Sequence, residues 1–506
     1  MVFRWRDKKR REEEKSIAHS LNFEGLKEEI KDSLKQSADL AFHEIEKDGI
    51  QILVIYIENI INTEQLHQHI IKPLERSDEE LDPRSLANTI NIGKISITNR
   101  LIDITEAILN GYAYIYAQGQ SCGVLADIAE KASRSLEKAE TESLVFGPKV
   151  AFTEDLSTNM NIIRTNVKDP NLCVEELVLG SRVKLKTYLV YVKDIADEEN
   201  VNTFRQRMKE LEVDSIIDSS VLAQMIEDNS YTVFPQLITT ELPDRLSISL
   251  LHGKIGVLVD RSPQAIIGPT TFLNFFESTE DIYMRWNMGT FLRMLRFIAI
   301  MLSVLLTPAY VAVLTYHYEV IPSSLLVSLG ESRSKVPFPP VFEALLLEFI
   351  IELLREAGAR LPTKVGQTMG IVGGIVIGQA AVEAGFTSNI LIIIIAISAL
   401  GSFTAPSYAI GTAVRIIRFP IIILAGLYGG VGIVFAFSFL LIHLLKLTTL
   451  GRPYLSPVYP LSVSDLRYSL FRLPYQFMGR RPDSNLPVDN QRMKKEKKTN
   501  TKDVDE

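Results

Sequence analysis

Three long stretches in the second half of the chain are almost free of charged side chains. Phe297–Tyr318 and Pro420–Leu445 contain no Asp, Glu, Lys or Arg, and Val365–Val414 contains only Glu383. A helix of about 20 apolar residues spans the roughly 30 Å of hydrocarbon in a bilayer. The pattern therefore predicts an α-helical polytopic membrane domain with four to six crossings, which makes the protein an integral membrane protein.

The first half of the chain alternates between helical and strand patterns. Asn22–Lys47 carries apolar residues at helical spacing, which predicts a single amphipathic helix. Ile50–Ile57 is rich in Ile and Val and predicts a strand, and a helix is expected at Thr63–Leu74. Ala107–Ile128 predicts a hairpin that turns at Gln118–Gly123. An α/β fold follows for this region.

Two segments of this α/β region recur later in the chain. Leu53–Ile60 (LVIYIENI) resembles Tyr188–Ile195 (YLVYVKDI), and Ile108–Ala117 (ILNGYAYIYA) resembles Leu250–Val259 (LLHGKIGVLV). Either two β-rich segments are alike by chance, or the region holds two related α/β subdomains, which is the simpler explanation. The domains expected are a charged tail with an N-terminal helix (1–48), two cytoplasmic α/β subdomains (49–145 and 146–290), a transmembrane domain (291–446) and a basic, proline-containing cytoplasmic tail (447–506).

One apolar segment, Phe342–Ala357, carries an acidic row. Because Glu348, Glu352 and Glu356 repeat every four residues, they share one face of a helix. The helix either lies on the membrane surface with solvated carboxylates, or lines an aqueous path in which rings of carboxylates favour cations. In either case Arg355 is placed to pair with Glu352. These four residues are the candidate pore or gating residues.

A glycine stripe follows the acidic row. Gly366, Gly370, Gly374 and Gly378 are four residues apart and lie along one side of a helix. Such stripes weaken a helix in water, whereas in lipid they let two helices approach closely. We expect these glycines to form a helix-packing face.

Four arginines flank the apolar stretches. Arg293 and Arg296 precede the first stretch and Arg415 and Arg418 precede the last, so all four are expected at the membrane interface. Arg293, Arg296 and the basic C-terminal tail predict that both ends of the domain are cytoplasmic, which requires an even number of crossings. Arg415 and Arg418 place positive charge at the opposite end of the last span and conflict with that count.

The motifs PFPPVFEALLLEFIIELLREAGARLP, VGQTMGIVGGIVIGQAAVEAG, SFTAPSYAIG and RIIRF occur in this order. In these motifs the chain resembles the A subunit of the GerA-type spore germination receptors. The resemblance implies a multi-pass protein of the spore inner membrane with a cytoplasmic N-terminal region. It also implies a transporter-like B subunit and a C lipoprotein as partners, nutrient sensing that triggers ion release, and an A subunit that oligomerises into a channel.

Net charge and cysteine content argue against several other classes of protein and of binding site. The net charge of −7 argues against a nucleic-acid-binding protein, and the two cysteines, Cys122 and Cys173, form no disulfide framework or zinc motif. Neither a cofactor nor a metal is expected. The N-terminus has no apolar core, so we do not interpret it as a signal peptide.

Two other function classes remain as alternatives. Glycine-interrupted helices are typical of secondary transporters, but those usually contain paired repeats in the membrane region, and the sequence shows none. Gly119–Gly123 matches the G-x-S-x-G elbow of serine hydrolases, with Ser121 as the nucleophile. That motif needs a strand-to-helix turn, whereas here it joins two predicted strands. We therefore expect no enzyme.

Overall fold

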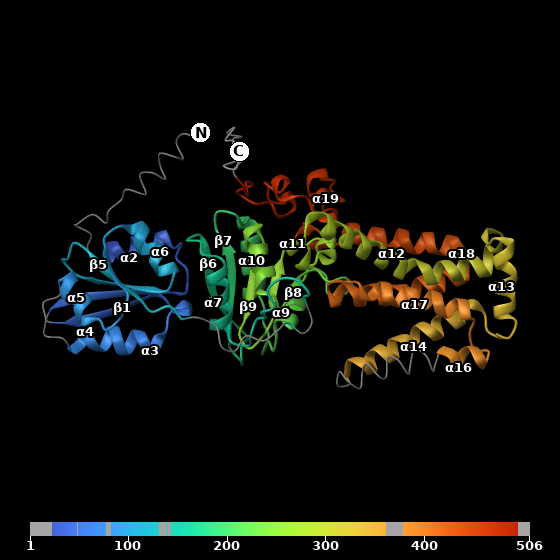
Figure 1. The fold of residues 1–506 in the computed structure, drawn as a ribbon, viewed down its shortest axis with the longest axis horizontal. Helices are drawn as coiled ribbons and strands as arrows, with labels where there is room; N and C mark the ends of the chain where they lie inside the picture. The colour runs from blue at the N-terminus through green and yellow to red at the C-terminus, as the bar shows by residue number, and fades with distance from the viewer. Residues whose placement is uncertain are drawn as a thin grey trace, which may run out of the picture. The chain divides into compact units, whose positions relative to one another are not determined.

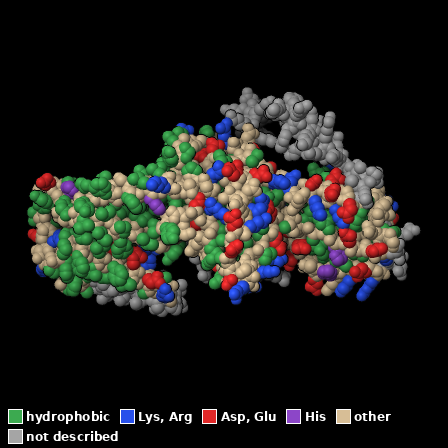
Figure 2. All heavy atoms as spheres, turned by 180° about the vertical axis from the view of Figure 1, so that it is seen from behind, with side chains coloured by type: hydrophobic (Ala, Val, Ile, Leu, Met, Phe, Trp, Pro, Cys, Tyr) green, Lys and Arg blue, Asp and Glu red, His purple; other side chains and the backbone are tan. Residues whose placement is uncertain are grey.

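The computed structural model describes residues 23–47, 49–76, 82–130, 139, 142, 144–360 and 378–493. They belong to two compact units. Unit 1 combines residues 1–227, 237–269 and 478–506, and unit 2 combines residues 228–236 and 270–477. Figure 2 shows charged side chains over the sheets of unit 1 and hydrophobic side chains over the helices of unit 2.

Unit 1 contains two five-stranded antiparallel sheets with the same strand order (Figure 1). The first runs β1-β2-β4-β5-β3 and the second β6-β7-β9-β10-β8. The strands of the first sheet are β1 Leu40–Lys47, β2 Ile50–Ile57, β3 Ile95–Thr98, β4 Tyr112–Ala117 and β5 Gly123–Asp127. Those of the second are β6 Leu172–Leu179, β7 Leu185–Val192, β8 Ile238–Thr240, β9 Ile255–Val259 and β10 Ala265–Gly268.

The two sheets also carry helices in the same order, so the predicted pair of related subdomains is confirmed. Corresponding positions pair alike: Ile52 lies opposite Ala117 in the first sheet, and Thr187 opposite Val259 in the second. The helices of the first subdomain are α2 Phe23–Ser33, α3 Thr63–Gln65, α4 Lys72–Arg76, α5 Pro83–Thr89 and α6 Leu101–Leu109, with a π-helical segment at Leu66–Ile71. Those of the second are α7 Leu156–Asn166, α8 Glu198–Lys209, α9 Ser219–Ile226 and α10 Pro243–Leu251.

The expectation of one helix over Asn22–Lys47 is wrong. Helix α2 ends at Ser33, because Lys35 and Gln36 both adopt a positive φ of 56°. Residues 40–47 form strand β1 instead, which pairs with β2 along its whole length. The apolar residues of 40–47 fit an edge strand as well as a helix, and pairing with the next strand in a tight hairpin overrides the helical periodicity.

A buried ion pair joins the two subdomains of unit 1. The Arg164 guanidinium of α7 donates to both carboxylate oxygens of Asp39, at 2.9 and 2.8 Å, and to Ser37 Oγ at 2.7 Å. The side chains of Arg164 and Asp39 are 2% and 0% exposed. The amide of Ala38 also donates to the Val174 carbonyl at 2.8 Å. The start of β1 is therefore fixed to the second subdomain.

Unit 2 is mainly helical, and two of its described helices, α12 and α18, are long and apolar enough to cross a membrane. The predicted glutamate helix is α14, and the 15-residue helix α17 lies within the nearly charge-free stretch that ends at Val414. The helices are α11 Glu280–Tyr283, α12 Trp286–Tyr316, α13 Ser323–Arg333, α14 Pro340–Arg360, α16 Gly378–Glu383, α17 Asn389–Phe403, α18 Tyr408–Lys446 and α19 Val463–Leu470. The described part of the unit also contains 3-10 turns at Phe272–Phe276, Tyr318–Val320 and Tyr475–Phe477, and the two short strands β11 Thr448–Thr449 and β12 Arg452–Pro453.

Helix α18 reverses direction at Gly429, whose φ is 61° and ψ is −140°. A Cβ atom added to Gly432 would lie 2.0 Å from the Leu424 carbonyl oxygen. In a continuous helix, residues eight apart are separated by about 12 Å along the axis. The chain therefore folds back, and residues 408–428 and 430–446 form two antiparallel halves of α18.

The contacts of the two halves fix their directions. Tyr316, at the end of α12, donates to the Leu427 carbonyl at 2.8 Å, so the first half runs in the same direction as α12. The second half begins beside His317, which accepts from the Gly430 amide at 3.1 Å. It ends with His443 bonded at 2.8 Å to Thr232, which places that end near the start of α12. The start of α12 and the end of α18 therefore lie at the same end of the bundle.

Candidate functional site in the helix bundle

The most buried polar contact of the bundle joins α14 to α18. Arg418 Nη1 lies 2.6 Å from a carboxylate oxygen of Glu348, and both side chains are 2% exposed. Thr307 of α12 donates to the other oxygen of Glu348 at 3.0 Å and lies 3.0 Å from Ser398 Oγ of α17. Arg418 also bonds Ser303 of α12. The ion pair is thus hydrogen-bonded to two hydroxyl groups of α12, and through Thr307 to a hydroxyl group of α17.

A second group of charges lies one turn along α14. Arg355 donates to Glu352 at 3.1 Å, and Arg415 of α18 lies 3.5 Å from the same carboxylate. The Arg355 guanidinium also donates to Ser402 at 3.2 Å and stacks over the Phe403 ring, 4.5 Å from its centroid. The pairing of Arg355 with Glu352 that the sequence allowed is present, and Arg415 is an additional partner.

The remaining carboxylates of α14 are also paired. Glu343 is fully buried and lies 2.8 Å from Arg333 of α13. Glu356 bonds Arg360 on the same helix, and both side chains are exposed. Each of the four carboxylates between Glu343 and Glu356 therefore has an arginine partner. For three of them that partner includes an arginine from another helix.

Helix α14 is packed mainly by its first half. Its buried residues are Glu343, Ala344, Leu347 and Glu348, and beyond Glu348 Phe349 and Leu353 are about half exposed. The first half contributes to an apolar core with residues of α12, α17 and α18. The second half has no fully buried side chain; Ile350 and Ile351 pack partly buried against the same core, and Glu352, Arg355 and their partners hold the rest of it to the bundle.

Sequence reasoning placed the carboxylates on one helix but missed their partners. Arg415 and Arg418 were expected at the membrane interface, yet their side chains are 10% and 2% exposed and point to Glu352 and Glu348. The guanidinium of Arg418 is therefore not available to a lipid headgroup in this structure. The missed signal was the cost of burying a charge in an apolar helix, which requires a partner of opposite sign.

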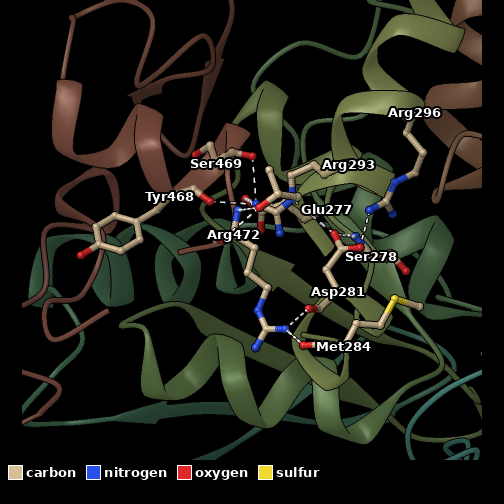
Figure 3. Close-up of polar contacts among 10 residues, drawn as sticks. Glu277, Ser278, Asp281, Met284, Arg293, Arg296, Tyr468, Ser469 and Arg472 are labelled. Carbon is tan, nitrogen blue, oxygen red and sulfur yellow. Dashed lines mark hydrogen bonds and ion pairs between the residues drawn. The ribbon is translucent and has the colours of Figure 1, made fainter. Parts of the chain in front are cut away.

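Arg293 and Arg296 are also turned inward. Figure 3 shows Asp281, which is 2% exposed, bonded to Arg293 at 3.2 Å and to Arg296. Arg293 donates further to the carbonyls of Tyr468 and Ser469, at 2.8 and 2.9 Å, so it connects α12 to α19. These arginines anchor α12 to neighbouring segments of unit 2.

The glycine stripe and the Ser121 motif lie away from these ion pairs in the sequence. Gly366, Gly370 and Gly374 lie outside the described residues, and a Cβ atom added to Gly378 would meet no atom within 4 Å. Ser121 lies in the turn between the antiparallel strands β4 and β5, and no strand-to-helix turn is formed there. Among the described residues, no group of three or more His, Cys, Asp or Glu side chains could hold a metal ion.

Two related α/β subdomains and a helical unit with membrane-length helices define an integral membrane protein with a large α/β region. The profile of the Bacillus/Clostridium GerA spore germination protein matches residues 28–484. The chain is 46% identical to spore germination protein GerQA of Bacillus cereus over 89% of this chain and 90% of that protein. It is 36% identical to spore germination protein B1 of Bacillus subtilis, over 92% of this chain and 97% of that protein.

A solved structure matches as well. The N-terminal domain of the A subunit of the Bacillus megaterium spore germinant receptor GerK3 is 26% identical, with a TM-score of 0.40, over 50% of this chain and 96% of that one. By the family profile and the relatives, the chain belongs to the GerA family of spore germination receptor A subunits. The family prediction is confirmed, and the family consists of germination receptors rather than enzymes.

Proposed function

We propose that copies of this chain surround a ligand-gated ion path, with α14 as the moving element of the gate. The observation that carries the proposal is the set of ion pairs that tie α14 to α13 and α18. Glu343, Glu348 and Glu352 are each bound to an arginine of another helix. In this arrangement the carboxylates are neutralised, which corresponds to a closed path.

The physical basis is the instability of a buried charge without its partner. Removing one member of a buried ion pair costs about 3–5 kcal/mol. Displacement of α14 must therefore either break the pairs or move its carboxylates into water. A water-filled axis shared by several copies would receive them, and a ring of carboxylates favours cations. The half-exposed second half of α14, beginning near Phe349, is the part free to make that movement.

The same proposal specifies the setting of the channel. The protein lies in the spore inner membrane with its N-terminal region in the cytoplasm. It acts with a transporter-like B subunit and a C lipoprotein, and nutrient binding on a partner is converted into ion release. Supporting this setting are the GerA family match and the spore germination proteins to which the chain is similar. The start of α12 and the end of α18 also lie at one end of the bundle, as an even number of crossings requires.

Substitution of Arg415 tests the gate. In spores that carry Arg415→Gln, Glu352 keeps only Arg355, so α14 is held more weakly and we expect ion release at lower nutrient concentration. Arg360→Gln is the matched control, because its pair with Glu356 is exposed and contributes about 0.5 kcal/mol or less. Release is followed with an ion-selective electrode, and immunoblots verify equal protein amounts. Identical nutrient dependence in both variants and wild type would exclude α14 as the gate.

A further inference from the structure

An apolar stripe begins on α12 before its charge-free stretch. The exposed side chains Met288, Phe291, Leu295, Ile298 and Leu302 are spaced by three or four residues, so they lie on one face of the helix. That face continues without interruption past Phe297, where the charge-free stretch begins. At 31 residues α12 is about 46 Å long, which exceeds the roughly 30 Å of hydrocarbon. The helix is therefore longer than an untilted crossing requires.

The C-terminal segment of unit 2 is fixed against these first turns. The hydroxyl of Thr290 donates to the Arg472 carbonyl at 2.9 Å and accepts from the Arg472 amide at 3.1 Å. Tyr475 donates to the Ile282 carbonyl at 3.1 Å. The segment exposes its own apolar side chains, which are Val458, Tyr459, Leu461, Val463, Phe471, Tyr475 and Phe477. We call residues 281–296 and 446–477 together the collar.

The exposed charges of the collar are all positive. Its two acidic residues, Asp281 and Asp465, are 1% and 2% exposed. The charged side chains that remain exposed are Arg285, Lys446 and Arg467. Arg293 and Arg296 are not among them, because both side chains point to Asp281, as Figure 3 shows. The collar thus combines aromatic and aliphatic side chains with cations and displays no carboxylate.

We propose that the collar lies in the headgroup layer of an anionic bilayer and that the segment 446–477 is an additional membrane anchor. Three features favour lipid: continuity with the apolar face of α12, the exposed aromatic rings, and exposed charge of one sign. Aromatic rings collect at the membrane–water interface, and Lys and Arg near the surface are attracted to anionic headgroups. The inference goes beyond the proposed channel, since it concerns a segment outside the charge-free stretches.

The tryptophan content of the chain allows a direct test. Trp5 and Trp286 are the two tryptophans, so Trp5→Phe leaves Trp286, which is 52% exposed, as a reporter of the collar. A second reporter is Phe477→Trp in a chain that lacks both native tryptophans. The full chain is reconstituted in phosphatidylglycerol-containing liposomes whose acyl chains are brominated near the headgroup. We expect severalfold stronger quenching of both reporters than of the unit 1 control Ile217→Trp, whose position is 78% exposed.

Quenching of both collar reporters no stronger than that of the Ile217→Trp control would overturn the proposal. The charge contribution is measured separately with Arg285→Gln, Lys446→Gln and Arg467→Gln combined in one chain. We expect this variant to lose most of the difference between anionic and zwitterionic liposomes. If co-purified partner subunits abolish the quenching, the surface binds protein and the lipid assignment fails. Because neither readout depends on ion flux, the result is independent of the channel proposal.

Discussion

At the scale of single residues, the structure is organised by buried charges that are paired across long sequence distances. Arg418 with Glu348 in the bundle and Arg164 with Asp39 in unit 1 are each almost completely buried. The four-residue repeat that contains Glu348 could be recognised from the sequence, but its pairing with Arg418 could not, and neither Arg164 nor Asp39 was singled out. A partner 70 or 125 residues away is determined by the fold alone.

Asp39→Asn is expected to lower the free energy of unfolding of unit 1 by about 3–5 kcal/mol, because it leaves the Arg164 guanidinium buried without a counter-charge. The control is Asp214→Asn, whose pair with Arg182 is exposed and should contribute about 1 kcal/mol or less. Urea unfolding of the purified chain, followed by far-ultraviolet circular dichroism, measures both. If both substitutions lower the free energy of unfolding equally, the buried pair contributes no more to stability than an exposed pair.

His252 should make unit 1 less stable in acid. Burial and the nearby cations Arg492, Lys254 and Arg481 lower the pKa of His252 from 6.5 to about 3. Between these values the unfolded chain binds a proton that the folded chain does not bind, so stability falls as the pH decreases. The loss reaches up to about 2 kcal/mol at pH 5.

Hydrogen exchange of α10 and β9, corrected for the intrinsic rate, measures this effect at pH 7 and pH 5. His252→Gln should remove most of the difference between the two pH values, because glutamine does not titrate. The hydrogen bond from Asn485 to the carbonyl of residue 252 can remain in the variant, since it uses only the backbone. An unchanged pH dependence in His252→Gln would assign the acid sensitivity to other groups.

At the scale of elements, patterns that a segment satisfies by itself were predictable, whereas structure that depends on pairing or packing with another segment was not. The strand Ile50–Ile57 and the helix beginning at Thr63 were both predicted correctly, since local composition decides them. Residues 40–47 were not, because β1 exists through its pairing with β2. The reversal within α18 was also missed. An apolar stretch with several glycines predicts one membrane span, and the sequence does not show which glycine adopts a positive φ, as Gly429 does.

Gly429→Ala should disrupt this reversal. A side chain is strained at a φ of 61°, and the added Cβ atom would lie 2.9 Å from His317 Nε2. Gly330→Ala is the matched control, because a Cβ atom there meets nothing within 4 Å. We expect a lower melting temperature in detergent and less membrane-inserted protein for Gly429→Ala alone. Wild-type values for Gly429→Ala would contradict a sharp turn at this position.

At the scale of the whole molecule, the repeat in the sequence correctly predicted two subdomains, and the charge-free stretches predicted a helical membrane region. The sequence gives no means of counting copies around an axis, because the contacts between copies depend on surfaces and not on periodicity. The number of crossings and the orientation therefore remain predictions, as does the packing role of the glycine stripe. The channel account depends on the position of α14 relative to water in the assembled receptor.

The most direct test of that account is thiol labelling along α14. In a chain with Cys122→Ser and Cys173→Ser, single cysteines are placed from Phe342 to Ala357 and exposed to a charged, membrane-impermeant thiol reagent in native membranes, with and without nutrient. We expect nutrient to raise the reactivity of cysteines at Ala344 and Leu345, which share the helical face of Glu348 and leave the ion pairs intact, but not at Phe349 or Leu353. Oxidative crosslinking should give species larger than dimers. Uniform labelling from one side, unchanged by nutrient and without such species, would contradict it.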